Sequence, residues 1–305
     1  MIAYAARRLG LALLVAVAVS AASFGLLYLT GDPATAIVGP SGTDADIENI
    51  RRVYGFDRPI VVQYVDWLWR ALHGDLGISF FFKLPVDDLL ANRLPITLTL
   101  GLTAIVFALV LAIPLGVAAA VRPNSAVDRL ALVLSVTGQA LPSFWFGLML
   151  IVLFSVIYPV LPSSGTESWK SFVLPSVVLG YYATPAIMRL TRSGMIEVLS
   201  SDYIRTARAK GLYRSSVLFK HALRNAIIPV VSLSAAQFGY MLAGSVVVES
   251  VFALQGAGRL AWESITRGDL PTVQAIILVF SLAYVVLTLL ADLLNAWLDP
   301  RIRIA

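Results

Sequence analysis

The residues best suited to interact chemically with another molecule lie in one polar stretch, from Asp202 to Pro229. It contains a single acid, Asp202, and six basic residues: Arg205, Arg208, Lys210, Arg214, Lys220 and Arg224. Arginine and lysine side chains at this density form ion pairs with acidic groups of another molecule. The stretch therefore predicts a docking surface for a soluble partner.

The same stretch has the pattern of two short helices. Asp202 is placed to cap the first, whose apolar side carries Tyr203, Ile204 and Ala207. Gly211 is predicted to end this helix, because glycine readily takes the left-handed conformation found at helix ends. The apolar positions of the second helix recur at helical spacing: Val217, Leu218, His221 and Ala222.

Signatures of catalysis do not accompany this stretch. The sequence has no Walker A pattern, no HExxH and no GxSxG motif. It has no cysteine and two histidines, His73 and His221, so neither thiol chemistry nor a histidine-based metal site is expected. We predict no catalytic residue and no metal ligand. Nucleic-acid binding is not expected either, because the basic residues flank apolar runs and form no continuous soluble face.

The composition places these residues in a membrane protein. Of 305 residues, 58% are apolar and 13% charged, and the mean hydropathy is +0.83, outside the range of ordinary soluble domains. Uncharged apolar runs of about 18 residues or more predict membrane-spanning helices. Six spans are predicted: 9–29, 94–121, 130–160, 172–188, 226–248 and 270–291. The run 172–188 is slightly short, but Arg189 and Arg192 follow it and can snorkel.

The basic residues also predict the orientation. Arg7 and Arg8 precede the first span, Arg301 and Arg303 follow the last, and six spans place both termini on one side. The positive-inside rule puts the termini in the cytoplasm together with the stretch 202–229.

Three parts of the chain are predicted. Residues 1–30 hold the N-terminus and a first span, which is too long for a signal-peptide core and is therefore retained. Residues 31–93 form an external region that contains an amphipathic helix at 60–72. Residues 94–305 form a five-helix core, which includes a cytoplasmic loop at 194–226.

Prolines and polar residues interrupt the predicted spans. Pro114 and Pro142 lie inside the second and third spans, where proline kinks a helix. Polar side chains in the span 226–248 require partners across a helix interface or in a water-filled path. Asp292, near the end of the last span, is predicted to pair with a nearby arginine or to lie at the membrane interface.

Several of these motifs resemble permease subunits of bacterial ABC importers, specifically the dipeptide, oligopeptide and nickel family. The segment RTARAKGL followed by HALRNAIIP is similar to the signature loop of these permeases, with Arg205 and Thr206 in place of a glutamate and an alanine. Further similar segments are GDPA at 31–34, GDLGIS at 74–79, NRLPITLTL at 92–100, LPSFWFG at 141–147 and DPRIR at 299–303.

The segment 249–271 is similar to the external re-entrant loop of the same family. Glu249, Phe252, Gly256 and Gly258 match its pattern, whereas Gln255 replaces a proline. Because of this replacement, the sequence does not predict the geometry of the turn.

The resemblance implies an all-α integral membrane fold with six transmembrane helices of the type I importer permease kind, and an external domain between the first two helices. It implies a bacterial inner-membrane location. The partners implied are a second homologous permease, two cytoplasmic ATPase subunits that bind ATP and Mg, an extracytoplasmic solute-binding protein and membrane lipid. Solute would then pass from the binding protein into the cytoplasm by alternating access, with no cofactor bound in this chain.

The resemblance also assigns a coupling loop that contacts an ATPase subunit: Ile204, Arg205, Thr206, Ala207, Arg208, Lys210, Gly211 and Leu212. The apolar members Ile204, Ala207 and Leu212 are expected to fill a cleft of the ATPase, and the basic members to pair with its acids. In this family the fifth span helps line the pathway, which makes candidates of Ser234, Gln237 and Tyr240. Hydrogen bonding within the bundle is the alternative for these residues.

Two other functions fit a polytopic membrane protein. A secondary transporter of a small solute would have coupling-ion carboxylates near mid-membrane and often repeated halves, and neither is evident in the sequence. A membrane receptor or assembly protein could dock a soluble partner through the basic stretch. Among importer substrates, peptides are the first expectation, with opines, nickel chelates and oligosaccharides as alternatives.

Overall fold

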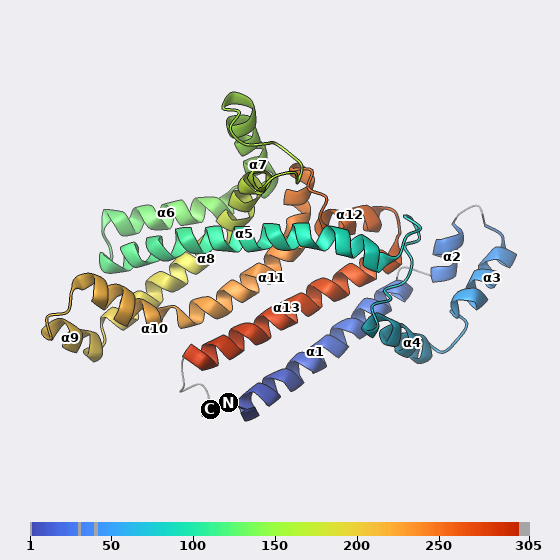
Figure 1. Cartoon of the computed structure of the whole chain (residues 1–305), viewed down its shortest axis with the longest axis horizontal. Coiled ribbons are helices and arrows are strands. Elements are labelled where there is room, and N and C mark those ends of the chain that lie inside the picture. The colour runs from blue at the N-terminus through green and yellow to red at the C-terminus, as the bar shows by residue number, and fades with distance from the viewer. Residues whose placement is uncertain (1, 30–31, 40–41, 299–305) are drawn as a thin grey trace.

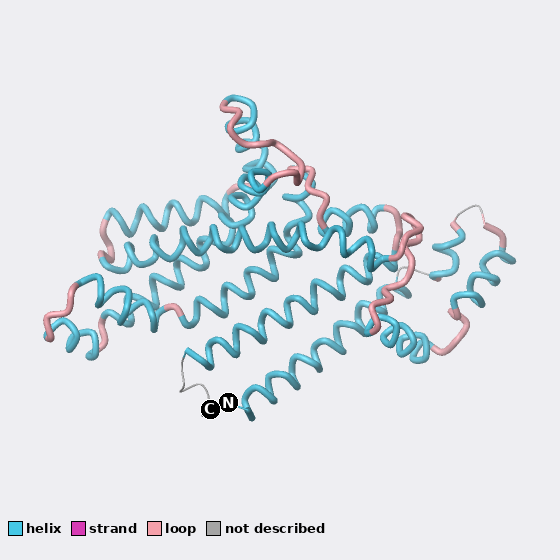
Figure 2. Tube along the Cα trace, viewed as in Figure 1, coloured by secondary structure: helices cyan, strands magenta, loops and turns pink. Residues whose placement is uncertain are grey.

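The computed structural model describes residues 2–29, 32–39 and 42–298, so the predicted basic flank at Arg301 and Arg303 lies outside the described residues. The described part is almost entirely helical (Figures 1 and 2). It contains no strand, and its one isolated β-bridge joins Ile78 to Pro85. The predicted all-α fold is confirmed.

Five of the six predicted spans are long apolar helices, each with the length and composition needed to cross a membrane. They are α1 (Ile2–Leu29), α5 (Val86–Val121), α8 (Val173–Leu199), α11 (Ile228–Val251) and α13 (Leu270–Leu298). α5 begins before the predicted boundary at residue 93, and α8 continues well beyond residue 188. Both helices are therefore longer than the apolar runs from which they were predicted.

The third predicted span, 130–160, is wrong as a single helix. It consists of α6 (Ala126–Ala140), α7 (Ser143–Ile151) and a π-helix, Val152–Ile157. Leu141 is extended, with φ −93° and ψ 131°, because a residue before proline is disfavoured in the helical conformation. Pro142 therefore breaks the helix completely: α6 lies along α5, whereas α7 turns out of that line and packs against α8 and α11 (Figure 1).

The remaining helices gather at two opposite ends of the bundle (Figure 1). One end, called the α9 end, holds α9 (Asp202–Ala209), a π-helix at Ser216–Leu223 and α10 (Arg224–Ala226). The other, called the α12 end, holds α2 (Pro33–Val38), α3 (Asp44–Tyr54), α4 (Ile60–Leu72) and α12 (Ala257–Thr266), and a 3₁₀ turn at Trp169–Phe172 precedes α8. The first turn of α1 and the last turn of α13 lie toward the α9 end. α4 confirms the helix predicted at 60–72.

Polar contacts attach the outer segments to the bundle. Asp269, which precedes α13, is fully buried and accepts hydrogen bonds from the Ser79 hydroxyl at 2.6 Å and the Phe80 backbone N–H at 2.8 Å. The motif at 74–79 is thereby tied to the start of α13. Near the other end of α13, Asp292 pairs with Arg8 of α1 at 2.7 Å, so the predicted pairing with an arginine is confirmed.

α5 and α8 form the closest helix pair in the core. A Cβ atom on Gly180 would lie 2.3 Å from the carbonyl oxygen of Ala104, and one on Gly116 would lie 2.8 Å from that of Met188. Helices approach this closely only where a small residue removes the side chain between them. The seam also includes the fully buried apolar residues Leu100, Ala108 and Ile187, and a hydrogen bond at 2.6 Å between the hydroxyls of Thr103 in α5 and Ser176 in α8.

Replacing Gly180 by alanine tests this contact. Alanine is the better helix former by about 1 kcal/mol, but overpacking a tight core costs about 1–3 kcal/mol. We expect the steric cost to dominate, because the atom in the way is a backbone carbonyl that cannot turn aside. Thermal unfolding in detergent should show a lower Tm for Gly180→Ala. Gly10→Ala is the matched control, because an added Cβ there meets nothing within 4 Å; equal Tm values would contradict the close contact.

Candidate coupling loop and translocation cavity

The first helix of the predicted coupling loop is α9. Its N-cap is Ser201, with φ −71° and ψ 154°, so the prediction that Asp202 caps it is wrong. Asp202 is the first helical residue, where its charge is still favourable next to free backbone N–H groups. The helix ends where predicted: Lys210 is the C-cap and Gly211 has φ +74°, in the left-handed region.

The two faces of α9 have different surroundings. Ile204 is 0% and Ala207 7% exposed, and both pack in a cluster with Met195 of α8, Val117 of α5 and Val217 of the π-helix. The prediction that Ile204 and Ala207 fill a cleft of a partner is therefore wrong, because their side chains are covered by their own chain. The rest of the predicted coupling set is exposed: Arg205, Thr206, Arg208, Lys210, Gly211 and Leu212.

The second helix of the loop has π geometry and spans Ser216–Leu223. Val217 and Ala222, five residues apart, are both buried against α9 and the ends of the spans, as expected when one turn takes more residues than in an α-helix. Asn225, in the following short helix, donates a hydrogen bond to the Tyr203 hydroxyl of α9 at 2.7 Å. α9 is thus held on both its apolar and its polar side.

An ion pair fixes α6 to α8 near the same end. Arg192 Nε donates to Asp128 Oδ1 at 2.6 Å and Arg192 Nη2 donates to Asp128 Oδ2 at 2.7 Å. The backbone N–H of Asn124 also donates to this carboxylate, at 2.8 Å. The Arg192 side chain, and then the Asn124 N–H, hold the pKa of Asp128 below its usual range. Sequence reasoning treated Arg192 only as a snorkelling flank of its span and missed this pair.

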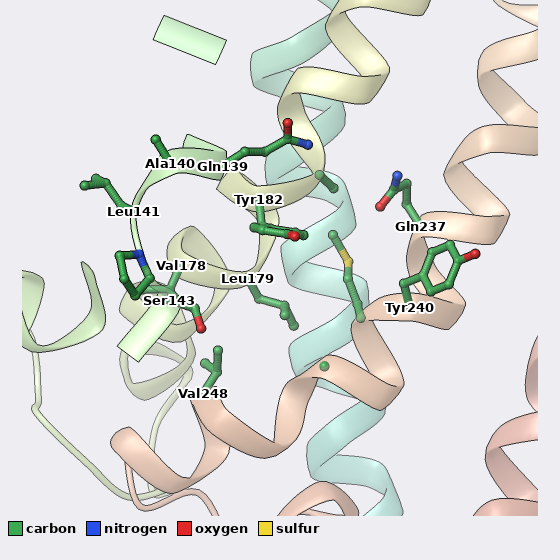
Figure 3. A pocket seen from close by; sticks show the side chains of 14 residues that line it. Gln139, Ala140, Leu141, Ser143, Val178, Leu179, Tyr182, Gln237, Tyr240 and Val248 are labelled. Carbon is green, nitrogen blue, oxygen red and sulfur yellow. The ribbon is translucent and has the colours of Figure 1, made fainter. Parts of the chain in front are cut away.

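A cavity of about 730 Å³ opens between the α6–α7 break, α8 and α11. Figure 3 shows Gln139 and Tyr182 on one side of it and Gln237 and Tyr240 on the other. Its wall is mostly apolar, with Leu179 and Val248 among the lining residues, and its polar groups are amides and hydroxyls. Such a cavity can bind an uncharged polar group through hydrogen bonds while burying apolar surface.

The predicted pathway residues have different positions. Gln237 and Tyr240 line the cavity, whereas Ser234 does not and donates within its own helix to Val230 O at 2.7 Å. Gln139 and Ser143 were missed by sequence reasoning. Both are polar residues near Pro142 in an otherwise apolar run, which could have marked them as cavity residues. Their position becomes clear only when Pro142 is recognised as a break in the helix, whereas the sequence predicted a kink.

Glu249 organises the segment between α11 and α13. Its carboxylate is fully buried and accepts from the Thr97 hydroxyl at 2.7 Å and from the Arg259 backbone N–H at 2.7 Å. Thr97 in turn accepts from the Ala257 N–H at 2.8 Å. The negative charge therefore lies at the first turn of α12, where the helix dipole stabilises it. Gln255, which replaces the proline of the family pattern, accepts through its backbone oxygen from Arg93 at 3.2 Å.

Comparison with known proteins places these features in a family. A family model described as "Binding-protein-dependent transport system inner membrane component" matches residues 112–304, and one for the N-terminal region of such membrane components matches residues 1–101. The chain is 43% identical to the glutathione transport system permease protein GsiC of Escherichia coli O6:H1, over 90% of each chain. It is 42% identical to the protein of the same name from Salmonella typhimurium, again over 90% of each chain.

The fold also occurs among solved structures. One of them is described as inward facing conformations of the MetNI methionine ABC transporter, with a TM-score of 0.53 and 21% identity. The match covers 71% of this chain and 95% of the other. At this level of identity the similarity concerns the fold alone.

Replacing Asp128 by asparagine tests the ion pair between α6 and α8. The variant leaves Arg192 without its charged partner, and we expect the free energy of unfolding at neutral pH to fall by about 1–3 kcal/mol. Because the folded pKa of Asp128 is lowered, its contribution is complete above the unfolded pKa of about 3.9 and is lost as the pH falls through the folded value. Thermal unfolding at several pH values should therefore show a constant difference near neutrality that narrows only in strong acid.

Asp202→Asn provides the matched control for this experiment. The Asp202 side chain is 92% exposed and pairs with Arg205 at the surface, where an ion pair contributes little. A Tm loss for Asp202→Asn as large as that for Asp128→Asn would mean that the buried pair has no special role.

Proposed function

Because the chain belongs to the family of binding-protein-dependent transport system inner membrane components, we propose that it carries short peptides of the glutathione kind. The chain is a multi-pass inner-membrane protein and a transmembrane permease subunit of an ATP-driven importer, and ATP hydrolysis resides in separate subunits. The observation that supports a peptide substrate is the 43% identity, over 90% of each chain, to a glutathione transport system permease.

The proposed assembly contains this subunit, a second homologous permease, two ATPase subunits and an external binding protein. ATP and Mg are held by the ATPase subunits. The proposed orientation places the α9 end in the cytoplasm, because basic residues concentrate there and cytoplasmic loops of membrane proteins carry an excess of arginine and lysine. Both termini are then cytoplasmic, and the α12 end faces the binding protein.

The exposed side of α9 is the proposed contact with an ATPase subunit. Arg205, Arg208 and Lys210 pair with its acidic groups, and Leu212, which is 41% exposed, supplies an apolar contact. The buried side, with Ile204 and Ala207, has a different role from the one that sequence reasoning gave it. It attaches α9 to α5 and α8, so that a displacement of the ATPase moves the ends of both spans together.

The cavity between α6, α7, α8 and α11 is the proposed solute path. Peptides present amide N–H and C=O groups and, in glutathione-like solutes, few apolar side chains. The side-chain amides of Gln139 and Gln237 can both donate to and accept from such groups. The hydroxyls of Tyr182 and Ser143 add further partners along the same wall.

Uptake of labelled glutathione into proteoliposomes containing the whole importer tests this path. Wild-type uptake should require both ATP and the binding protein. Gln237→Leu removes one hydrogen-bonding side chain from the cavity, and we expect KM to rise about five- to tenfold with little change in kcat. Ser234→Ala is the matched control, since Ser234 lies on the same helix and does not line the cavity. Unchanged KM for Gln237→Leu would remove this cavity from the path, and uptake without ATP would contradict the importer.

Replacing Gly211 by valine tests the coupling loop. Gly211 has φ +74°, a conformation that costs a β-branched residue about 1–3 kcal/mol, so the end of α9 should change its direction. We expect ATP hydrolysis to continue while uptake per ATP falls severalfold. Gly74→Val is the control, because Gly74 has φ +88° with equally open surroundings but follows α4, which belongs to the α12 end. An unchanged ratio of uptake to hydrolysis in Gly211→Val would rule out the coupling role.

A further inference from the structure

Two adjoining hollows lie where α5 meets the segment after α9. The first is a groove of about 550 Å³ lined by Ile113, Pro114, Val117, Ala118, Val121, Arg122, Val127, Arg214, Leu218 and Phe219. The second is a pocket of about 420 Å³ lined by Val121, Leu199, Arg208, Leu212, Arg214, Val217 and Leu218. Val121, Arg214 and Leu218 belong to both, so the two hollows form one continuous surface.

The groove is apolar along the length of α5 and ends in positive charge. From Ile113 to Val121 the helix rises roughly 12 Å, which is most of the thickness of one hydrocarbon leaflet, about 15 Å. Phe219 of the π-helix also lines the groove and is 61% exposed. Arg122 follows directly after Val121, at the end of the span. An apolar groove at this depth is open to the acyl chains of the membrane.

The guanidinium groups at the end of the groove have no acidic partner. Among the described residues, the guanidinium groups of Arg122 and Arg214 form no ion pair and no hydrogen bond, and no acid lines either hollow. Two other arginines at this end are paired, Arg192 with Asp128 and Arg205 with Asp202. Arg208 also lines the adjoining pocket, but it belongs to the proposed ATPase contact and is not counted as a headgroup ligand. Guanidinium groups bind phosphate oxygens in pairs, through parallel N–H donors.

We propose that this surface is a binding site for an anionic phospholipid. The headgroup phosphate lies between Arg122 and Arg214, and one acyl chain lies along α5 in the groove. An anionic phospholipid fits both features of the site, the deep apolar groove and the unpaired positive charge. A soluble phosphate would leave the groove unfilled, and a zwitterionic lipid would bring its own positive group toward the arginines. Basic pockets between membrane helices are recognised sites for anionic headgroups. The proposal requires a membrane but depends on neither the solute nor the partners proposed above.

A lipid at this site would connect α5 to the coupling loop. Arg122 belongs to the end of α5, and Arg214 lies in the turn between α9 and the π-helix. One phosphate shared by the two guanidinium groups holds these segments together at the point where the motion of α9 reaches the spans. Membrane composition could then change how efficiently ATP hydrolysis drives uptake.

Native mass spectrometry of the purified importer, titrated with phosphatidylglycerol, tests the proposal. We expect the variant Arg122→Gln/Arg214→Gln to weaken phosphatidylglycerol binding about 30-fold, since both arginines attract the same headgroup. Ala118→Phe should also weaken it, because Ala118 is exposed and its larger replacement fills the groove without entering the core. Phosphatidylcholine should bind weakly to the wild type and to all variants.

Matched controls separate a site from general surface charge. Arg129→Gln/Arg224→Gln removes the same charge from exposed positions at the same end, and Val106→Phe enlarges an exposed residue of α5 outside the groove. Both controls should retain wild-type binding. If Arg129→Gln/Arg224→Gln weakened phosphatidylglycerol binding as much as Arg122→Gln/Arg214→Gln, the binding would reflect nonspecific attraction to surface charge, and the proposal would be overturned. It would also be overturned by equal binding of phosphatidylcholine, or by glycerol phosphate competing as strongly as the lipid.

Discussion

The close contact between the backbones of α5 and α8 is the constraint on which the rest of the structure depends. Two glycines, Gly116 and Gly180, bring the helices so near that a single methyl group would collide with a carbonyl oxygen. Packing of this kind resists sliding, because small and large groups interlock over the length of the pair. The two helices therefore act as one body to which the coupling loop and one wall of the cavity are attached.

The attachment at each end of the bundle uses a buried carboxylate. At the α9 end, Asp128 joins α6 to α8 through two hydrogen bonds from Arg192. At the α12 end, Glu249 joins α11 and α5 to the first turn of α12. A buried charge is tolerated when donors satisfy its oxygens, and here the donors come from separate helices. Asp128 thus fixes α6 relative to α8, and Glu249 fixes α12 relative to α11 and α5.

The buried side of α9 connects these elements to function. Ile204 and Ala207 share a cluster with α5 and α8, while the basic side chains of the same helix remain exposed. In the proposed coupling role, α9 transmits the motion of the ATPase subunit through apolar packing on one side and receives it through polar contacts on the other. The cavity lies against the same two-helix body, since Val178, Leu179 and Ala183 of α8 form part of its wall. A movement of α9 that shifts α8 must change the shape of this cavity.

The sequence by itself determined five of the six predicted spans, because burial in lipid requires long apolar runs whatever the neighbouring helices are. It also determined the helix at 60–72, the left-handed end at Gly211 and the family, since these depend on local conformation or on extended motifs. Only the tertiary structure decided whether Pro142 kinks a helix or breaks it, because that outcome depends on what packs beside the freed backbone. The same holds for the side of α9 that faces its own chain, and for Glu249, whose partner Thr97 is distant in the sequence. Local pattern specifies which side chains are apolar or charged, but their partners are set by helices that meet only when the chain has folded.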